Sequence, residues 1–238
     1  MEMNGIQPLV CPECGNELEG LSSDAVFFCK YCQTAAEITP GGLKMYPVTV
    51  AYPEKESLKP DVCIPFWSFE ISVEVRLNGA GTECPPNMAV HAFEHMQRKI
   101  MDTAQRVVGH WTRVLVPAIR MFRPSYYGDP GFIYSCLQKE IPSFKQERGI
   151  GQFVMLGASR KLVDAARYPR LYALLAVDRI IDITKLDLVI QFKNAQILGI
   201  PFARVHDRAF DCVLKRDYPS FLFEDWEAMT DRQKKFRG

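Results

Sequence analysis

The sequence contains no long hydrophobic run and no dominant charge. Its richest apolar stretch, 171–177, is far shorter than the roughly 18 residues that a membrane-spanning helix needs. The N-terminal segment has no basic stretch followed by an apolar one, so we expect no secretory signal and a cytoplasmic protein. The formal net charge is only +1 over 238 residues, which argues against a disordered polyelectrolyte. Glycine and proline, 15 and 16 residues, are too few for a collagen-like chain.

The composition is that of a folded globular protein, with 47% hydrophobic and 24% charged residues. The length suits one large domain or two small ones. Charge is spread unevenly, because residues 1–62 contain nine acidic residues and four lysines, a net charge of −5. The remainder of the chain therefore carries +6, which is a weak electrostatic signal for a nucleic-acid-binding protein.

Four of the eight cysteines form two CxxC pairs near the N-terminus. The pairs are Cys11-Pro12-Glu13-Cys14 and Cys29-Lys30-Tyr31-Cys32, and fourteen residues separate them. In a reducing compartment such cysteines are thiols or metal ligands rather than disulfides. Four thiolates suit tetrahedral Zn²⁺, and a closed shell of four cysteines leaves no position for water or substrate, so we expect a structural zinc site. Gly15 follows the first pair and can adopt the positive φ that such a turn favours.

These two pairs resemble the knuckles of transcription-factor-type zinc ribbons, and the resemblance covers about 30 residues. It implies a small metal-stabilised module and leaves open nucleic-acid binding, protein docking or plain stabilisation. The rest of the chain is similar to uncharacterised bacterial proteins that carry an N-terminal ribbon, which implies no activity. Rubredoxin-like iron is the alternative metal, but such sites have a glycine after each pair, and here Gln33 follows the second.

The sequence predicts a zinc ribbon over residues 1–40 and an α+β body with mainly antiparallel strands over 45–238. The breaker at 39–42 separates them. Period-two alternation or β-branched content predicts strands, and three-to-four spacing predicts helices. The expected strands are 46–52, 62–77, 114–122, 152–156, 180–193, 195–205 and 208–215, and the expected helices are 87–111, 129–140, 159–167, 169–178 and 220–237.

The tripeptide Ile-Pro-Phe occurs twice, at 64–66 and 200–202, in both cases beside β-rich sequence. Coincidence of common residues is the favoured explanation of this repetition, and two related halves of the body are the alternative. In the same region 65–69 is unusually aromatic. Because its neighbours Glu70 and Glu74 would repel nucleic acid, we expect these aromatic residues in the core.

Other motifs are weaker indications of a functional site. His91, Glu94 and His95 match the HxxEH pattern of inverted zinc peptidases, but they fall on the polar side of the expected helix with arginines, which favours a solvated face. The segment that contains Gly149 and Gly151 lacks the lysine of a phosphate-binding loop, so we expect a turn there. His206-Asp207 predicts a turn between strands. The isolated cysteines are expected to be small buried hydrophobic residues: Cys63, Cys84, Cys136 and Cys212.

The sequence therefore contains one strong metal site and no coherent set of catalytic residues. We expect a non-enzymatic adaptor or assembly subunit whose partner is another protein or a second copy of the chain. The alternatives are a nucleic-acid-binding protein and a metal-dependent hydrolase that uses His91, Glu94 and His95. The best candidate contact for an acidic partner is a basic set of residues: Arg98, Lys99, Arg106, Arg113, Arg120 and Arg123.

Overall fold

The computed structural model describes residues 9–20, 23–53, 58–77, 112–121, 130–136, 144–149, 155, 158–168, 186–223 and 226. Within these ranges the chain forms nine strands, two α-helices and one 3-10 turn. In chain order the elements are β1 (Val26–Cys29), β2 (Thr34–Thr39), β3 (Gly42–Pro53), β4 (Val62–Leu77), β5 (Thr112–Pro117), α2 (Pro130–Cys136), β6 (Phe144–Arg148), α3 (Leu162–Ala165), β7 (Leu186–Val205), β8 (Arg208–Asp211), β9 (Arg216–Pro219) and η3 (Ser220–Leu222).

The described part of the chain is dominated by β-structure, so the prediction of an α+β body is wrong. α2 and α3 have seven and four residues, whereas β4 and β7 have 16 and 20. The helix expected over 159–167 is the single turn α3, and the chain before it is extended, with the Arg160 N–H donating to the distant Ala118 carbonyl. The expected helices over 87–111, 169–178 and most of 220–237 lie outside the described residues.

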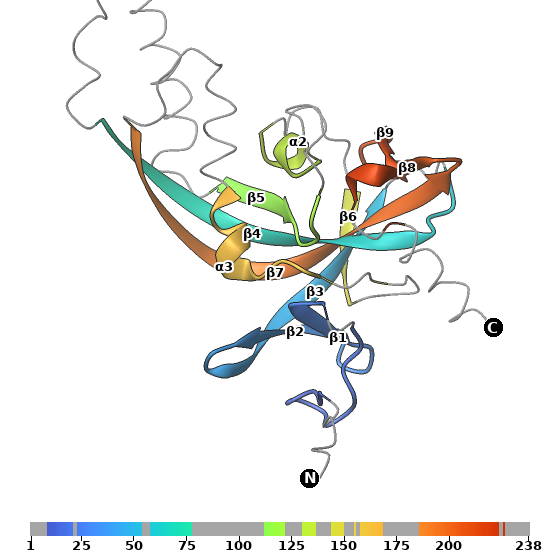
Figure 1. The fold of residues 1–238 in the computed structure, drawn as a ribbon, viewed down its shortest axis with the longest axis horizontal. Helices are drawn as coiled ribbons and strands as arrows, with labels where there is room; N and C mark the ends of the chain where they lie inside the picture. Colours follow the sequence, from blue (N-terminus) through green and yellow to red (C-terminus); the bar gives the residue numbers. More distant parts are fainter. Residues whose placement is uncertain are drawn as a thin grey trace, which may run out of the picture.

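The strands form one mixed sheet in the order β1-β2-β3-β7-β4-β5. β6 pairs with β3, and the β8–β9 hairpin extends the sheet from β7. All the pairings are antiparallel except that of β3 with β7. In Figure 1 the long strands β4 and β7 curve side by side across the molecule, with α2 and the β8–β9 hairpin above them and β1–β3 below.

β3 belongs to two parts of this sheet. Residues 42–47 pair with β2, whereas 48–50 pair with β7 and 49–53 with β6. The expected breaker at 39–42 is the tight turn of the β2–β3 hairpin, where Thr39 Oγ1 donates to the Gly42 carbonyl at 2.8 Å and Gly42 has φ of +106°. The N-terminal strands are thus joined to the rest of the sheet by a continuous strand.

β7 is a single strand where the sequence predicted two, over 180–193 and 195–205. The predicted break falls on Asn194, which has φ of +54°. There the pairing with β4 shifts register between Ser68 and Glu70, so that one extra residue is accommodated on β7. A β-bulge of this kind bends a strand without ending it, and asparagine tolerates the left-handed conformation.

The two Ile-Pro-Phe segments lie opposite each other. Ile64 of β4 pairs with Ile200 of β7, and antiparallel pairing places the two prolines one residue to either side of this point. The Pro65 carbonyl accepts the N–H of Ala118, just past the end of β5, and the Pro201 carbonyl accepts that of Cys212, just past β8. Because each proline faces the end of its neighbouring strand, its missing N–H removes no bond from within a ladder, which explains two prolines in central strands.

Each face of the central sheet has its own hydrophobic core. Phe66 and Phe202 pack on one face with Tyr134 of α2 and the C-terminal Phe223 and Trp226. On the opposite face, Trp67 and Phe69 pack with residues of β1–β3 and α3, namely Val26, Phe28, Ala35, Tyr46, Val48, Leu162 and Ala165. The expectation that 65–69 serves the core is confirmed, since its aromatic residues are buried.

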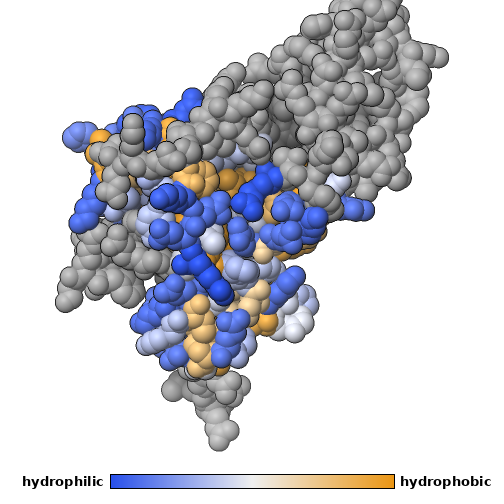
Figure 2. All heavy atoms as spheres, turned by 180° about the vertical axis from the view of Figure 1, so that it is seen from behind, coloured by the Kyte–Doolittle hydropathy of each residue, from blue (hydrophilic) through white to orange (hydrophobic). Residues whose placement is uncertain are grey.

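We call residues 9–39 the four-cysteine module. It forms the lower lobe in Figure 2, where hydrophobic side chains lie among hydrophilic ones. Three of its large hydrophobic residues are exposed: Val10, Tyr31 and Ile38. Neither described helix is long and apolar enough to cross a bilayer.

Candidate metal centre

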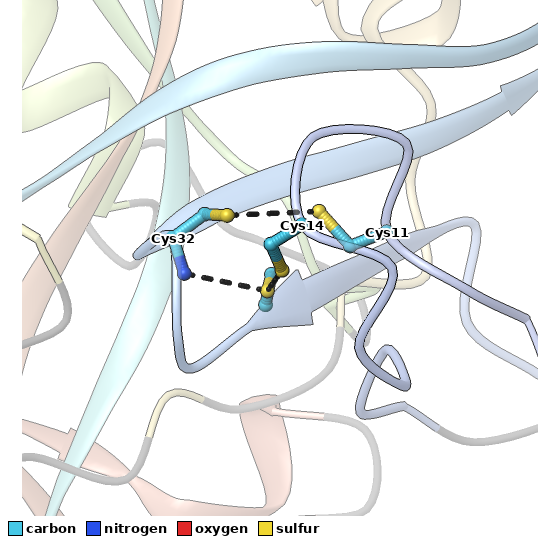
Figure 3. A group of neighbouring side chains, drawn as sticks. Cys11, Cys14 and Cys32 are labelled. Atoms are coloured by element: carbon cyan, nitrogen blue, oxygen red, sulfur yellow. Dashed lines mark hydrogen bonds between the residues drawn. The ribbon is translucent and has the colours of Figure 1, made fainter.

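The four paired cysteines come from two tight turns of the four-cysteine module. Cys11 and Cys14 lie in the turn that follows Val10, and Val10 forms a bridge with Glu17. Cys29 ends β1, and Cys32 lies in the turn that leads to β2. β1 therefore brings the second pair back toward the first, as Figure 3 shows.

Local backbone geometry fixes the first turn. The Gly15 N–H donates to the Cys11 carbonyl at 2.8 Å, and the Cys11 N–H donates to the Asn16 carbonyl at 2.7 Å. Gly15 has φ of +72°, so the positive φ predicted for it is confirmed. Gln33 takes the same role after the second pair with φ of +55°, a strained value that glycine would adopt more readily.

The four sulfur atoms lie close enough to share one ion. All four Sγ atoms are within 4.8 Å of one another. Cys11 Sγ lies 3.9 Å from Cys32 Sγ, and Cys14 Sγ lies 3.6 Å from Cys29 Sγ. A tetrahedral zinc ion with Zn–S bonds of about 2.3 Å requires sulfur–sulfur distances of about 3.8 Å. The two measured distances bracket this value, so the donor set fits Zn²⁺.

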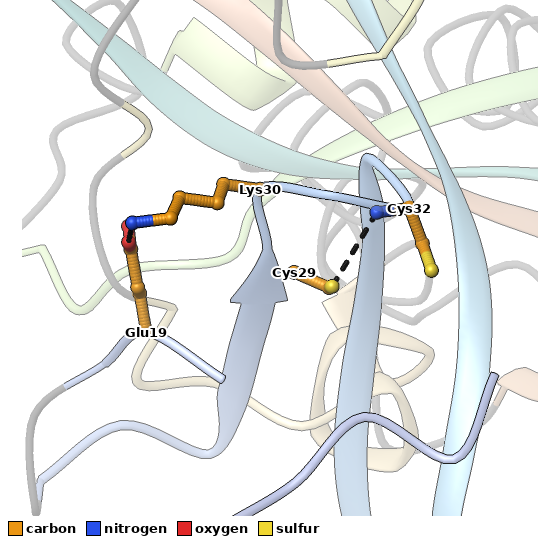
Figure 4. A network of polar contacts seen from close by, with 4 residues as sticks. All are labelled: Glu19, Cys29, Lys30 and Cys32. Carbon is orange, nitrogen blue, oxygen red and sulfur yellow. Dashed lines mark hydrogen bonds and ion pairs between the residues drawn. The ribbon is translucent and has the colours of Figure 1, made fainter. Parts of the chain in front are cut away.

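Two N–H groups point at these sulfur atoms. Asn16 Nδ2 donates to Cys14 Sγ at 3.2 Å, and the Cys32 backbone N–H donates to Cys29 Sγ at 3.4 Å, as drawn in Figure 4. Such bonds stabilise a thiolate and orient it toward a metal. The role of Asn16 was missed by the sequence analysis, although an amide side chain two residues after a ligand is a signal that could have indicated it.

The pKa values of three of the thiols are shifted, and the shifts run in different directions. The Asn16 side-chain amide, followed by the Asn16 backbone, lowers the pKa of Cys14 to about 6. Burial raises the pKa of Cys29, and the contact with Cys14 is the largest cause that raises the pKa of Cys32. Thiolates this close cannot all ionise unless a positive charge compensates them. The electrostatics therefore also favour a divalent cation.

The hydrophobic support around the site is small. Its buried members are Cys11, Leu18, Cys29 and Ala36, so half of this cluster consists of cysteines from the two pairs. Lys30 of the second turn pairs with Glu19 at 3.0 Å (Figure 4), but both side chains are exposed and such pairs contribute little. The apolar cluster next to the cysteines is thus small, which is typical of sites where a bound ion contributes to folding.

The structure also places several weaker candidates. Gly149 lies in a turn after β6 with φ of +98°, and His206-Asp207 forms the turn between β7 and β8, as predicted. Cys63 and Cys212 are buried, as expected of small hydrophobic residues. Arg113 and Arg120 are exposed. The remaining candidates lie outside the described residues: His91, Glu94, His95, Cys84, Arg98, Lys99, Arg106 and Arg123.

Among the described residues, the four paired cysteines are the single group of three or more ligand-type side chains that could hold a metal. Cys136 ends α2, and its side chain is not described. Comparison of the chain with family models, with curated proteins and with solved structures gives no match. The site is therefore interpreted from its own geometry.

Proposed function

We propose that residues 1–40 form a zinc ribbon in which Cys11, Cys14, Cys29 and Cys32 hold a structural Zn²⁺, and that the chain works as a non-enzymatic adaptor or assembly subunit. The observation that carries this proposal is the closed set of four sulfur atoms within 4.8 Å of one another. Four thiolates complete a tetrahedral shell, so no position is left for a water nucleophile or a substrate. In this proposal residues 45–238 form the body that carries the partner surface.

The way the four-cysteine module is attached supports a rigid docking element. It shares β3 and one hydrophobic core with the rest of the sheet, so it is held in one orientation. Tyr31 lies between the second pair of ligands and is 62% exposed, and Val10 precedes the first pair and is also exposed. Exposed aromatic residues on a rigid element are typical of protein contacts. Unpaired buried thiols at Cys63 and Cys212 suit a reducing, cytoplasmic setting.

Elemental analysis of the purified full chain tests the metal assignment. Inductively coupled plasma mass spectrometry should find one zinc per chain and no stoichiometric iron. Visible absorption provides an independent check, because four thiolates around ferric iron give a coloured protein. A colourless chain without zinc would remove the assignment, and a coloured iron-containing chain would replace zinc with iron.

Affinity capture followed by native mass spectrometry tests the adaptor role. The wild-type chain should retain a protein partner or form a defined oligomer, and Tyr31→Ala should lose it. Phe221→Ala is the matched control, because Phe221 is equally exposed but belongs to η3. A wild-type monomer that retains nothing would contradict the proposal, and a complex that dissociates on nuclease treatment would favour nucleic-acid binding instead.

A further inference from the structure

One short segment connects the four-cysteine module to the central sheet. We call Ala158–Ala165 the bridge segment; it ends with α3. On the module side, the backbone N–H groups of Ala25 and Val26 donate to the Ala158 carbonyl at 2.7 and 3.0 Å. Farther along, the Leu162 N–H donates to Glu37 Oε1 of β2 at 3.0 Å. Both β1 and β2 therefore hold this segment in place.

The other side of the bridge segment contacts the body. Trp67 Nε1 of β4 donates to the Arg160 carbonyl at 2.8 Å, and the Arg160 N–H donates to the Ala118 carbonyl at 2.8 Å. The Arg160 guanidinium group donates to the Pro117 carbonyl. Leu162 and Ala165 fill the core beside Trp67. The bridge segment thus has partners on both sides, and its single helical turn is far too short to be stable alone.

The hydrogen bond between Leu162 and Glu37 makes the bridge segment depend on where β2 lies. Its carboxylate is buried, with only 4% of the residue exposed. Besides Leu162, it accepts a bond from the Tyr46 hydroxyl at 2.9 Å. A buried carboxylate is costly unless donors surround it. Any movement of β2 therefore has to carry Leu162 along or leave this charge without one of its donors.

Gln33 provides a second contact, directly beside a ligand cysteine. It follows Cys32, and its side chain lies against Gly149: a Cβ added to Gly149 would come within 1.7 Å of Gln33 Oε1 and 3.3 Å of Gln33 Cβ. β2 begins next to Gln33, and β6 ends next to Gly149, so these two strands meet here along β3. The Gly149 N–H donates to the Val48 carbonyl of β3 at 2.7 Å. Because residue 149 is glycine, the body leaves room there for the side chain of Gln33, which follows the second CxxC pair.

We propose that ion binding by the four cysteines sets the order of the bridge segment and of the turn at Gly149, so that the body changes with metal occupancy. The proposal rests on the zinc site proposed above. An ion fixes Cys29 and Cys32, which bracket the turn between β1 and β2. That turn positions Gln33 and, through β2, Glu37. Without the ion, the small cluster around the cysteines cannot hold the turn, and the bridge segment loses its partners on the module side.

Amide hydrogen exchange of the full chain, measured by NMR with and without one equivalent of zinc, tests this coupling. Removal of zinc should speed exchange of the Leu162 and Gly149 amides by at least about tenfold. The internal controls are the Val213 and Leu214 amides, which donate to Asp211 in the core on the opposite face of the sheet and should change by less than about twofold.

Variants separate coupling from metal binding. Glu37→Ala should still bind one zinc, but its Leu162 amide should exchange at the same rate with and without the ion. Glu19→Ala is the matched control, because Glu19 is an exposed acidic residue of the same module that pairs with Lys30; it should behave like the wild type. If Glu37→Ala does not fold, Gln33→Ala with the Gly149 amide as readout serves the same purpose.

The metal content of the same samples distinguishes the two proposals. A chain that never binds an ion overturns both the zinc site and the coupling. A chain that binds one zinc, yet shows no change at Leu162 and Gly149 beyond that at Val213 and Leu214, overturns the coupling and leaves the zinc site standing.

Discussion

The two ends of the molecule are stabilised by different means. In the four-cysteine module the buried apolar cluster has four members, two of which are cysteines. Among the residues that the structure describes, the core that contains Phe202 and Trp226 has seventeen buried members and is rich in aromatic residues. Apolar burial contributes about 25 cal/mol per Å², so the large core stabilises its part of the sheet far more than the cluster around the cysteines stabilises the two CxxC turns. In the proposed zinc site, metal binding, worth about 10–16 kcal/mol in comparable peptides, would add to the stability of the module.

The core around Trp67 belongs to both regions, since it joins residues of β1–β3 to β4, β7 and α3. In the proposed arrangement, a part that depends on the ion and a part that does not depend on it share one sheet. The following changes separate the two, beginning with the largest expected effect.

Replacement of a buried ligand should disrupt the two CxxC turns and, through the proposed coupling, the bridge segment and the turn at Gly149, while the large core stays intact. We expect Cys29→Ser to lose stoichiometric zinc, because a serine hydroxyl is a poor zinc ligand and Cys29 is fully buried within the set. Amides of the two CxxC turns should then exchange faster, whereas those of β2 remain paired with β3. Elemental analysis and hydrogen exchange measure both effects.

Cys63→Ala is the control for this change, since Cys63 is equally buried but lies on β4 outside the metal centre. It should keep one zinc. Full zinc content in Cys29→Ser would contradict the assignment of this ligand.

Truncation of a side chain in the large core should lower the stability of the body and leave metal binding intact. Phe202→Ala removes a fully buried ring that lies 5.6 Å from the Phe223 ring and 6.2 Å from the Tyr218 ring. We expect a loss of about 3–5 kcal/mol in the free energy of unfolding, with one zinc still bound by the folded fraction. Urea unfolding followed by circular dichroism gives the free energy.

Phe221→Ala is the matched control, because the Phe221 side chain is 71% exposed. Its effect should stay within about 0.5 kcal/mol. Equal losses for the two phenylalanines would mean that this core does not support the sheet.

The large core also contains a buried acid with its own pH dependence. Burial raises the pKa of Asp211 from 3.8 to about 7, although its Oδ1 accepts the N–H groups of Val213 and Leu214 and the Tyr134 hydroxyl donates to both carboxylate oxygens. Between pH 4 and pH 7, the folded chain keeps a proton that the unfolded chain has released. Folding stability from this group is therefore present at low pH and is lost as pH rises through about 7.

Asp211→Asn should remove this dependence, so the variant should gain stability relative to the wild type between pH 5 and pH 8. A shift of one pKa unit corresponds to about 1.4 kcal/mol, so the relative gain should reach on the order of 2–4 kcal/mol. Urea unfolding of both chains at saturating zinc measures it, because the pH dependence of zinc binding is common to both and cancels. Parallel stability curves would show that Asp211 ionises equally in both states.

The smallest effect concerns the hydrogen bond to a ligand. Asn16→Ala removes the N–H donor to Cys14 Sγ and should weaken zinc affinity by about 10–100-fold, with the fold unchanged. Competition with a chromophoric chelator at fixed pH gives the affinity. Glu13→Gln, an exposed change in the same turn, should leave it unaltered; equal weakening in both variants would assign the effect to the turn rather than to the bond.

The clustering of the four cysteines could be predicted from sequence because it depends on local spacing. The spacing within each CxxC pair determines that two sulfur atoms can share an ion, and Gly15 has the conformation expected next to such a turn. The roles of Gln33 and Glu37 were not identified, because they depend on contacts between residues far apart in sequence. Gln33 meets Gly149, more than a hundred residues away, and Glu37 meets Leu162, also distant in sequence.

The fold was predicted less well for the same reason. β4 begins and ends where the alternation over 62–77 placed it, because its pattern is carried by the strand itself. β7 was divided at Asn194, since a bulge and a strand end look alike without the partner strand. The short helix α3 was overextended at its N-terminal end, because the Arg160 and Leu162 N–H groups donate to Ala118 and Glu37, which no local periodicity reveals.

The course of β3 has a consequence for any attempt to separate the module from the body. Removal of residues 1–41 would take away β2 and leave residues 43–47 as an open sheet edge beside the rest of β3. Unprotected edges of this kind recruit strands from other molecules, so a truncated chain would be prone to aggregate. The module thus also shields the sheet from self-association, and it cannot be exchanged between proteins as an independent cassette.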